Sequence, residues 1–397
     1  MQMPRKSTRA AQGDGCMRLR SDGRWEGMYT VGIDPGTGKQ VRKSVYAATQ
    51  GECRKKLREA TEAVENGTYS EPSKMTIGEW LAIWLNEYTG NVKENTHVTY
   101  ETQVRIHIKP ALGAVRLLDL KPHHIQAFYN RLQKGDAGIA PLSAKTIKNV
   151  NGVFHRALDQ AAILGYVRQN PCIGVKLPRV IEPEMHPLTE IEMNAFLKAI
   201  KGNEYERMFI VDMFTGMRQS EIMGLTWDRI DFIAGTIFVD RQLIHEKKKG
   251  GLYKFAPTKN DKPRKLTPAP MVMKVLQDVK RSQAERRIAA GSLWNDGGFP
   301  GLVFSNCFGG HYVHNTITHN ITRIAAGIGI EGLRFHDLRH TYAVASLRAG
   351  DDVKTVQCNL GHATAAFTLD RYAHYTEDMR KDSAARMDAF MKGLEGL

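Results

Sequence analysis

The strongest signal in this sequence lies in one stretch of about forty residues near the C-terminus. It opens as FHDLRHTYAVASL (335–347), continues through LGH (360–362) and closes with TLDRYAHY (368–375). The apolar spacing of the first segment predicts a helix, on which His336 and Arg339 lie three residues apart and therefore on one face. An imidazole and a guanidinium thus point the same way, and Tyr372 follows them.

These side chains are of the types that handle phosphate. A guanidinium presents a planar, permanently charged fork to two phosphate oxygens, and an imidazole donates or moves a proton near neutral pH. Tyrosine adds a nucleophile, but its reference pKa of about 10 leaves roughly one hydroxyl in a thousand ionised at pH 7, so it needs cationic neighbours. A core histidine beside a surface arginine would give the same short pattern, so support must come from elsewhere in the chain.

Two further segments supply that support. Arg218 lies in TGMRQSE, directly after the apolar run 208–214 and at a helix-start signal. Residues 257–264 (PTKNDKPR) are typical of a tight turn that joins two strands, with Lys259 at its edge.

Taken in order, five motifs resemble those of the tyrosine recombinases, also called the phage integrase family: TGMRQSEIMGLTWDRID, TKNDKPRKLTP, FHDLRHTYA, LGH and TLDRYAHYT. The resemblance spans roughly residues 185–390, and the upstream half is similar to the integrases of conjugative transposons. It implies the following active residues: Arg218, Lys259, His336, Arg339, His362 and Tyr372, with Glu221 as a supporting acid. It implies neither a metal nor another cofactor. In the family the lysine usually precedes an arginine by four positions, whereas Lys259 lies five before Arg264, so Lys262 is an alternative to Lys259.

The resemblance also implies a mechanism and partners. Tyr372 would attack a DNA phosphate and become joined to the 3′ end, while the arginines and His362 hold the non-bridging oxygens. Lys259 would protonate the leaving oxygen and His336 would assist proton transfer. The expected substrate is double-stranded DNA at the ends and target of a mobile element. A dimer to tetramer of this chain would bind it, and an accessory excision factor is a further candidate partner.

Composition agrees with a DNA-acting protein of two or three domains. The 397 residues are 42% apolar, and a net charge of +14 favours a polyanionic partner. The five cysteines are dispersed and never spaced as CxxC, which predicts a reduced cytoplasm. The expected action on DNA places the protein there at the nucleoid. No apolar run is long enough to predict a membrane span or a secretory signal.

The upstream half divides into smaller pieces. Residues 1–14 are expected to be a disordered basic tail. Residues 15–68 are predicted to form strands at 17–20, 25–33 and 40–46 before a helix, and the resemblance implies that they are an arm-type DNA-binding domain. Residues 1–60 carry thirteen Lys and Arg against six Asp and Glu. Five basic residues on the strands are candidates for DNA contact, although a solvated basic face is the alternative: Arg18, Arg20, Arg24, Arg42 and Lys43.

By the same resemblance, a helical core-binding domain and the catalytic domain come next. Helices are predicted at 77–88, 95–108, 123–132 and 143–164 within a domain at 74–170, whose polar faces present Lys93, Lys145 and Lys148 for phosphate contacts. Residues 171–187 hold four prolines and are predicted to be a linker. The catalytic domain, 188–397, is expected to be mainly helical with a small sheet (237–243, 253–256, 264–266) and a C-terminal tail helix at 378–394. The fold class is therefore multidomain and mainly α.

Three other functions fit parts of the pattern. HDLRH resembles the HExxH of zinc hydrolases, but aspartate replaces glutamate, and no third ligand is evident. A DNA-binding regulator that does not cleave would keep the same fold. A monomeric, topoisomerase-like enzyme would use the same side chains, although the arm-type domain favours recombination between defined sites.

Overall fold

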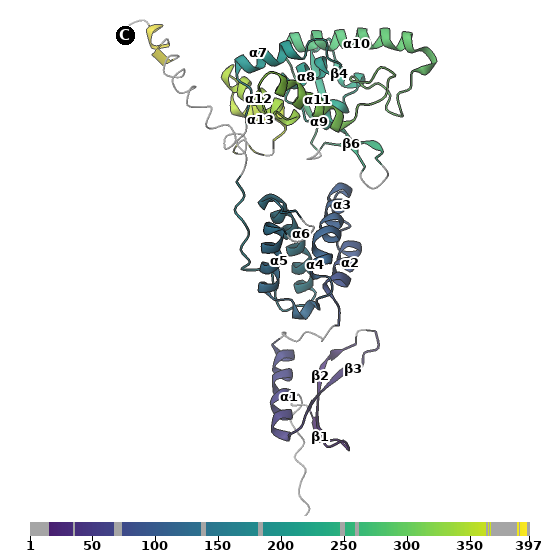
Figure 1. The fold of residues 1–397 in the computed structure, drawn as a ribbon, viewed down its shortest axis with the longest axis vertical. Helices are drawn as coiled ribbons and strands as arrows, with labels where there is room; N and C mark the ends of the chain where they lie inside the picture. Colours follow the sequence, from purple (N-terminus) through teal and green to yellow (C-terminus); the bar gives the residue numbers. More distant parts are fainter. Residues whose placement is uncertain are drawn as a thin grey trace, which may run out of the picture. The chain divides into compact units, whose positions relative to one another are not determined.

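The computed structural model describes residues 16–34, 36–66, 74–135, 140–181, 186–246, 251–258 and 262–362, together with 364, 366, 387, 388 and 390–394. The chain forms two compact units, Met1–Ile181 and Glu182–Leu397 (Figure 1). Their division falls inside the predicted linker. The predicted basic tail 1–14 lies outside the described residues, as does most of the predicted tail helix 378–394.

The first unit begins with a three-stranded antiparallel sheet covered by one helix, as predicted. Its elements are β1 (Cys16–Leu19), β2 (Trp25–Ile33), β3 (Gln40–Ala47) and α1 (Gln50–Glu65). Thr49 caps α1 by accepting a hydrogen bond from the Glu52 N–H, 3.3 Å. The helix packs against Gly27, where a Cβ atom would lie 3.3 Å from both the Cys53 sulfur and the Leu57 Cβ. The absent side chain therefore lets the helix and the sheet approach.

A helical bundle follows in the same unit, and the four predicted helical runs are confirmed. Its elements are α2 (Ile77–Glu87), α3 (Glu94–Gln103), the π-helical turn η1 (Val104–Ile108), α4 (Lys109–Leu112), the 3₁₀ turn η2 (Leu117–Asp119), α5 (Pro122–Lys134) and α6 (Ala144–Ile163). A capping box between Thr76 and Glu79 starts α2. The buried Trp80 donates from Nε1 to the Ala157 carbonyl, 2.9 Å, and so joins α2 to α6.

The second unit is mainly helical, as predicted. Its helices are α7 (Glu190–Ala199), α8 (Glu206–Met213), α9 (Gln219–Met223), α10 (Pro270–Ala290), α11 (His314–Gly327), α12 (Phe335–Arg348) and α13 (Val353–Leu360), with 3₁₀ turns η3 (Trp227–Arg229) and η4 (Gly291–Leu293). A capping box between Thr189 and Glu192 starts α7. The aromatic rings of Phe196, Phe209 and Phe335 join α7, α8 and α12, and all three side chains are buried.

The strands of this unit form two small sheets, so the prediction of one sheet is wrong. The strands are β4 (Ile230–Asp231), β5 (Thr236–Val239), β6 (Arg241–His245), β7 (Tyr253–Pro257) and β8 (Arg264–Leu266). β5 pairs with β4 and β8, whereas β6 pairs with β7. The predicted strand 237–243 is interrupted at Asp240, whose carboxylate accepts from Arg229 and Arg241. β7 and β8 therefore belong to different sheets and do not pair with each other as a hairpin.

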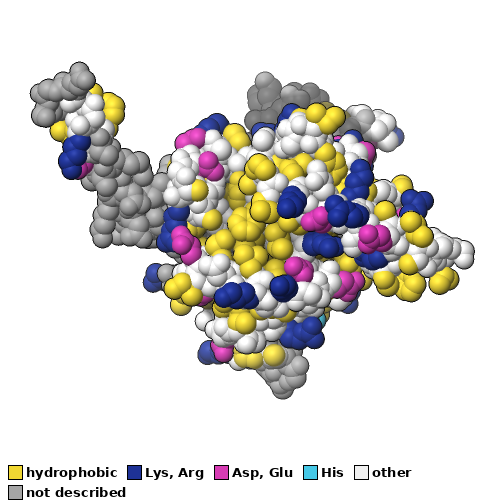
Figure 2. Space-filling view, turned by 90° about the horizontal axis from the view of Figure 1, so that it is seen from above, with side chains coloured by type: hydrophobic (Ala, Val, Ile, Leu, Met, Phe, Trp, Pro, Cys, Tyr) yellow, Lys and Arg dark blue, Asp and Glu magenta, His cyan; other side chains and the backbone are white. Residues whose placement is uncertain are grey.

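Surface charge is mixed on the face drawn in Figure 2. Hydrophobic side chains gather in its middle, with basic and acidic side chains interspersed around them. A nucleic-acid footprint is a basic patch or stripe, so this face does not have that pattern. Among the described residues, no helix is both long and apolar enough to cross a membrane.

Candidate active site

Arg339 is the buried centre of the phosphate-handling motifs. It lies in the second turn of α12, and only 2% of the residue is exposed. Nη1 donates to the Gly216 carbonyl, 2.6 Å, and Nη2 donates to the Leu360 carbonyl. Gly216 has a φ of +62°, and a Cβ there would lie 2.5 Å from the Tyr342 ring. Only glycine fits both the conformation and the space, which explains the TGMR turn.

Arg218 occupies the N-cap position of α9 and is held by the acid that the resemblance implied. Its Nη1 donates to Glu221 Oε1, 2.7 Å, and its backbone N–H donates to Glu221 Oε2, 2.9 Å. The Glu221 side chain is 0% exposed, whereas 20% of the Arg218 side chain is exposed. Arg264 supplies a second guanidinium to the same carboxylate. Burial would raise the pKa of Glu221, but the hydrogen bonds and charge of Arg264 and Arg218 outweigh it and lower that pKa to about 2.

The C-terminus of α13 brings the motifs together. Three successive carbonyls there each accept from a different arginine: Asn359 from Arg264 Nε (2.7 Å), Leu360 from Arg339 Nη2, and Gly361 from Arg218 Nη2 (3.4 Å). Gly361 ends the helix in the left-handed conformation, with a φ of +64°. His362 follows directly, and its N–H donates to the Gln357 carbonyl, 3.1 Å. Arg218, Arg264 and Arg339 thus form an arginine cluster, and the LGH motif positions an imidazole beside it.

The histidines of this site are poor proton acceptors without DNA. The pKa of His336 falls to about 4 because the surrounding protein removes part of its hydration and Arg339 adds positive potential. The same two causes lower the pKa of His362 to about 3. Both imidazoles are therefore neutral at pH 7 and offer one N–H and one acceptor nitrogen each.

Two predicted residues lie outside the described part of the chain: Lys259 and Tyr372, and with them Tyr375. Lys262 is described and exposed, and its carbonyl accepts from the Thr258 hydroxyl, 3.1 Å. The structure thus brings together Arg218, Glu221, Arg339 and His362, with His336 within their electrostatic reach.

The HDLRH motif does not have the geometry of a zinc helix. The rings of His336 and His340 meet edge to face, with centroids 4.9 Å apart. The Asp337 carboxylate is occupied by Arg334, which donates at 2.9 Å from Nη2 and at 3.1 Å from Nε. Asp337 also accepts from the Arg334 backbone N–H and so starts α12. The acid of the motif therefore caps a helix.

The basic residues predicted for the N-terminal sheet lie in three places: on each of its two faces and in the turn between β1 and β2. Arg18 and Arg42 lie opposite Glu26 and Thr30 in the register, on the face away from α1. Lys43 lies on the other face, opposite Tyr29. Placing Arg20 and Arg24 on the strands was wrong: both belong to the β1–β2 turn, where Arg24 pairs with Asp22 at 2.9 Å and Arg20 with Asp22 at 3.6 Å.

The three candidate lysines of the helical bundle are exposed. Lys93 is the N-cap residue of α3, and Lys145 and Lys148 lie three residues apart on α6. Ile147 and Val150 of the same helix are buried, so the lysines lie on the solvent side.

Two residues of the site were not found from the sequence as site residues. Arg264 was noted only for its spacing from Lys259. Asp212 is 0% exposed on α8 and lies close enough to Arg339 to interact with its charge. The sequence feature that could have identified it is its place as a single aspartate within the apolar run 208–214.

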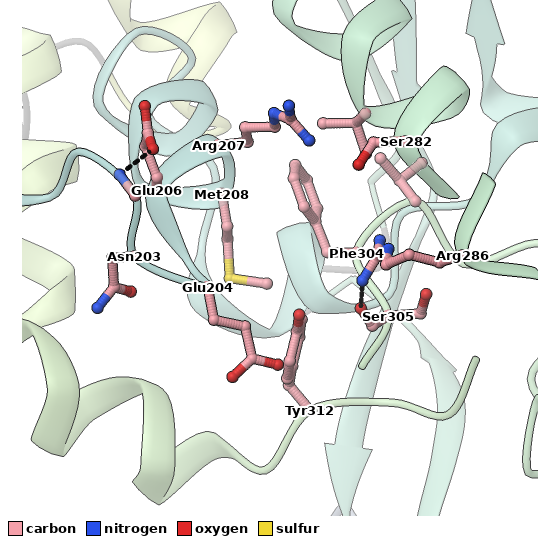
Figure 3. A pocket seen from close by; sticks show the side chains of 13 residues that line it. Asn203, Glu204, Glu206, Arg207, Met208, Ser282, Arg286, Phe304, Ser305 and Tyr312 are labelled. Carbon is pink, nitrogen blue, oxygen red and sulfur yellow. Dashed lines mark hydrogen bonds between the residues drawn. The ribbon is translucent and has the colours of Figure 1, made fainter. Parts of the chain in front are cut away.

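A separate pocket of about 330 Å³ lies in the same unit and contains none of these residues (Figure 3). Arg286 donates there to the Ser305 carbonyl, 3.2 Å, and the Glu206 carboxylate accepts from the Gly202 N–H, 2.6 Å. Charges of both signs line it, so it does not concentrate positive potential as the arginine cluster does.

Comparison with known proteins is consistent with this geometry. Residues 187–379 match the phage integrase family, and residues 76–133 match the phage integrase N-terminal SAM-like domain. The chain is 30% identical over 363 residues to a tyrosine recombinase XerC-like protein of Caldanaerobacter subterraneus subsp. tengcongensis, covering 87% of this chain and 90% of that protein. It is 26% identical to the transposase from transposon Tn916 of Enterococcus faecalis, covering 84% and 83%.

Solved structures extend the comparison to the fold. The Tn1549 transposon integrase in complex with a circular intermediate DNA superposes with a TM-score of 0.65 and 26% identity, over 79% of this chain and 99% of that one. A lambda integrase dimer bound to a core site has the same fold, with a TM-score of 0.56 and 17% identity over 93% and 96%. The chain belongs to the phage integrase family of tyrosine recombinases.

Proposed function

We propose that this chain is a site-specific DNA recombinase that cuts and rejoins strands through a covalent 3′-phosphotyrosine, in the excision and integration of a mobile element. One observation carries the proposal: Arg218, Arg339 and His362 converge on a single helix end from motifs far apart in the sequence. Cationic donors gathered at one point suit a phosphate whose charge changes during reaction.

In the proposed reaction the Tyr372 hydroxyl oxygen attacks phosphorus, and the bond to the 5′ oxygen breaks. Lys259 or Lys262 gives a proton to that oxygen, so the products are a phosphotyrosine and a free 5′ hydroxyl. The arginines and His362 donate to the non-bridging oxygens, and loss of one such donor typically costs about 3–4 kcal/mol of transition-state stabilisation. His336 assists proton transfer by accepting the Tyr372 hydroxyl proton, because the negative charge of a bound phosphate raises its proton affinity. The phosphotyrosine keeps the energy of the phosphodiester, so another strand's hydroxyl reverses the attack.

The proposed partners follow from this chemistry. Exchange between two sites needs at least two protomers on double-stranded DNA, and four for two complete duplexes. We assign catalysis to residues 188–397, DNA clamping to 74–170 through Lys93, Lys145 and Lys148, and arm-type binding to 15–68. The proposed location is the cytoplasm, at the nucleoid. The Tn1549 integrase, which was solved with a circular intermediate DNA, supports a transposon as the element.

The test is a covalent-adduct assay. Wild type, Tyr372→Phe and Tyr375→Phe are incubated in EDTA with nicked DNA carrying a site that the chain binds, and the products are separated on a denaturing gel. A shifted band with wild type and Tyr375→Phe that vanishes with Tyr372→Phe is the expected result. If no variant gives a band on DNA that it demonstrably binds, the chain is instead a DNA-binding regulator.

A further inference from the structure

Arg264 makes three hydrogen bonds beside Arg218 and Arg339. It is the first residue of β8, and 8% of its side chain is exposed. Nη1 and Nη2 donate to the two oxygens of Glu221, at 3.1 and 2.6 Å, and Nε donates to the Asn359 carbonyl at 2.7 Å. A bidentate pair of this kind fixes both partners in orientation as well as in distance.

The charges of the cluster depend on this residue. Glu221 is a buried anion that also accepts from Arg218, and with its pKa near 2 it stays ionised at neutral pH. With Arg264 present, two guanidinium groups share one carboxylate, so the trio has a net charge of +1. Without it, Glu221 would neutralise Arg218, the partly exposed guanidinium. Arg264 therefore preserves the attraction of Arg218 for a phosphate.

The geometry of the cluster depends on it as well. Arg264 ties β8 to the end of α13, one residue before the carbonyl that holds Arg339. A Cβ atom on Gly361 would lie 3.3 Å from Arg264 Cδ and from Nη1, so the guanidinium packs directly beneath the turn that leads to His362. β8 also follows the segment that carries Lys259 and Lys262.

We propose that Arg264 is a positioning residue for strand cleavage: it sets the charge and orientation of Arg218 and fixes the turn before His362. The proposal rests on the proposed function. Lysine cannot take this place, because an ammonium lacks the planar fork that reaches both carboxylate oxygens and the carbonyl together.

The test compares single-turnover formation of the covalent adduct on two DNA substrates. One has a normal scissile phosphate, and the other a methylphosphonate, which replaces a charged non-bridging oxygen by a methyl group. Arg264→Lys should slow adduct formation on the phosphodiester by about a hundredfold or more, within the range of a lost oxyanion donor, with little change in DNA affinity. On the methylphosphonate the deficit should shrink at least about tenfold, because less negative charge needs stabilisation. The matched control is Lys265→Gln, the exposed next residue of β8.

Equal deficits on both substrates would show a merely structural role, and no deficit on either would also overturn the proposal. If Arg264→Lys unfolds, the double variant Arg264→Gln with Glu221→Gln replaces it, since this pair leaves no buried unpaired charge. The double variant should cleave faster than Arg264→Gln alone, and equal or slower cleavage contradicts the charge argument. Failure of the proposed function is distinguishable, because wild type itself would then form no adduct.

Discussion

Replacing Asp212 by asparagine should stabilise the second unit increasingly as the pH rises. Asp212 is 0% exposed, and among the described residues neither carboxylate oxygen has a hydrogen-bond partner. Burial raises the pKa of Asp212 well above its ordinary value, and the negative charge of Glu221 adds to the shift while Arg339 opposes it. The folded protein thus keeps this group protonated at a pH where the unfolded chain has released the proton.

The magnitude follows from proton linkage. The unfolded carboxyl has a pKa of about 3.9, and above it the folded state binds more protons than the unfolded state. Stability therefore falls with rising pH by about 1.4 kcal/mol per unit until the pKa of the folded state is reached. Asparagine does not titrate, so its advantage over wild type should grow at that rate. The cost of burying an unbonded amide is constant with pH and does not affect the slope.

The assay is urea unfolding of the full chain between about pH 5 and pH 8. Wild type and Asp212→Asn are compared at each pH, and Asp278→Asn gives the effect of the same substitution on α10 at a side chain that is 44% exposed. A stability difference that is independent of pH, or that narrows as the pH rises, would refute the reasoning. Adduct formation should survive in Asp212→Asn, because a neutral group at this position leaves the charge of Arg339 intact.

Three other predictions concern different parts of the molecule. Burial and the nearby His245 and His311 lower the pKa of His314 to about 4. The unfolded chain then binds this proton more readily than the folded one, so the free energy of unfolding should fall as the pH falls from about 6.5 to about 4. When unfolding is measured at a series of acidic pH values, His314→Phe should reduce this loss of stability by up to roughly 3 kcal/mol. Gly216→Ala meets the Tyr342 ring at a positive φ, so a drop of about 1–3 kcal/mol in unfolding free energy should accompany slow adduct formation with DNA binding retained. Arg18→Gln with Arg42→Gln should weaken DNA binding by the N-terminal domain and reduce the salt slope by about one for each phosphate that these arginines neutralise, whereas Lys43→Gln on the other face should leave the slope unchanged.

Local patterns predicted the elements well where a turn or cap defines them. Each strand of the N-terminal sheet begins and ends within one residue of its predicted bounds, and α7 starts at a capping box. The small sheets of the second unit were mispredicted because no turn or cap marks where one strand ends and the next begins. Asp240 interrupts an apolar alternation that continues on both sides, and which strand pairs with which is a long-range choice.

The motifs identified the residue types of the site, but pairings between distant segments lay beyond them. Nothing in the spacing of Glu221 and Arg264, 43 residues apart, shows that their side chains meet. The role of Asp212 was equally hidden, because a lone aspartate on an apolar helix is also compatible with a surface position. Burial and charge balance are properties of the folded unit, so these roles required the structure.

The end of α13 explains why the cationic cluster forms without DNA. The last carbonyls of a helix lack partners within it and carry the negative end of the helix dipole. Here the Gln357 and Cys358 carbonyls accept from the backbone N–H groups that follow the helix. The last two carbonyls, those of Asn359 and Leu360, accept from Arg264 and Arg339. The carbonyls at the helix end need hydrogen-bond donors, and the buried guanidinium groups need acceptors. Each set of groups therefore satisfies the other. A phosphate then meets guanidinium groups that are already oriented, and the reorganisation that would otherwise oppose cleavage has occurred during folding.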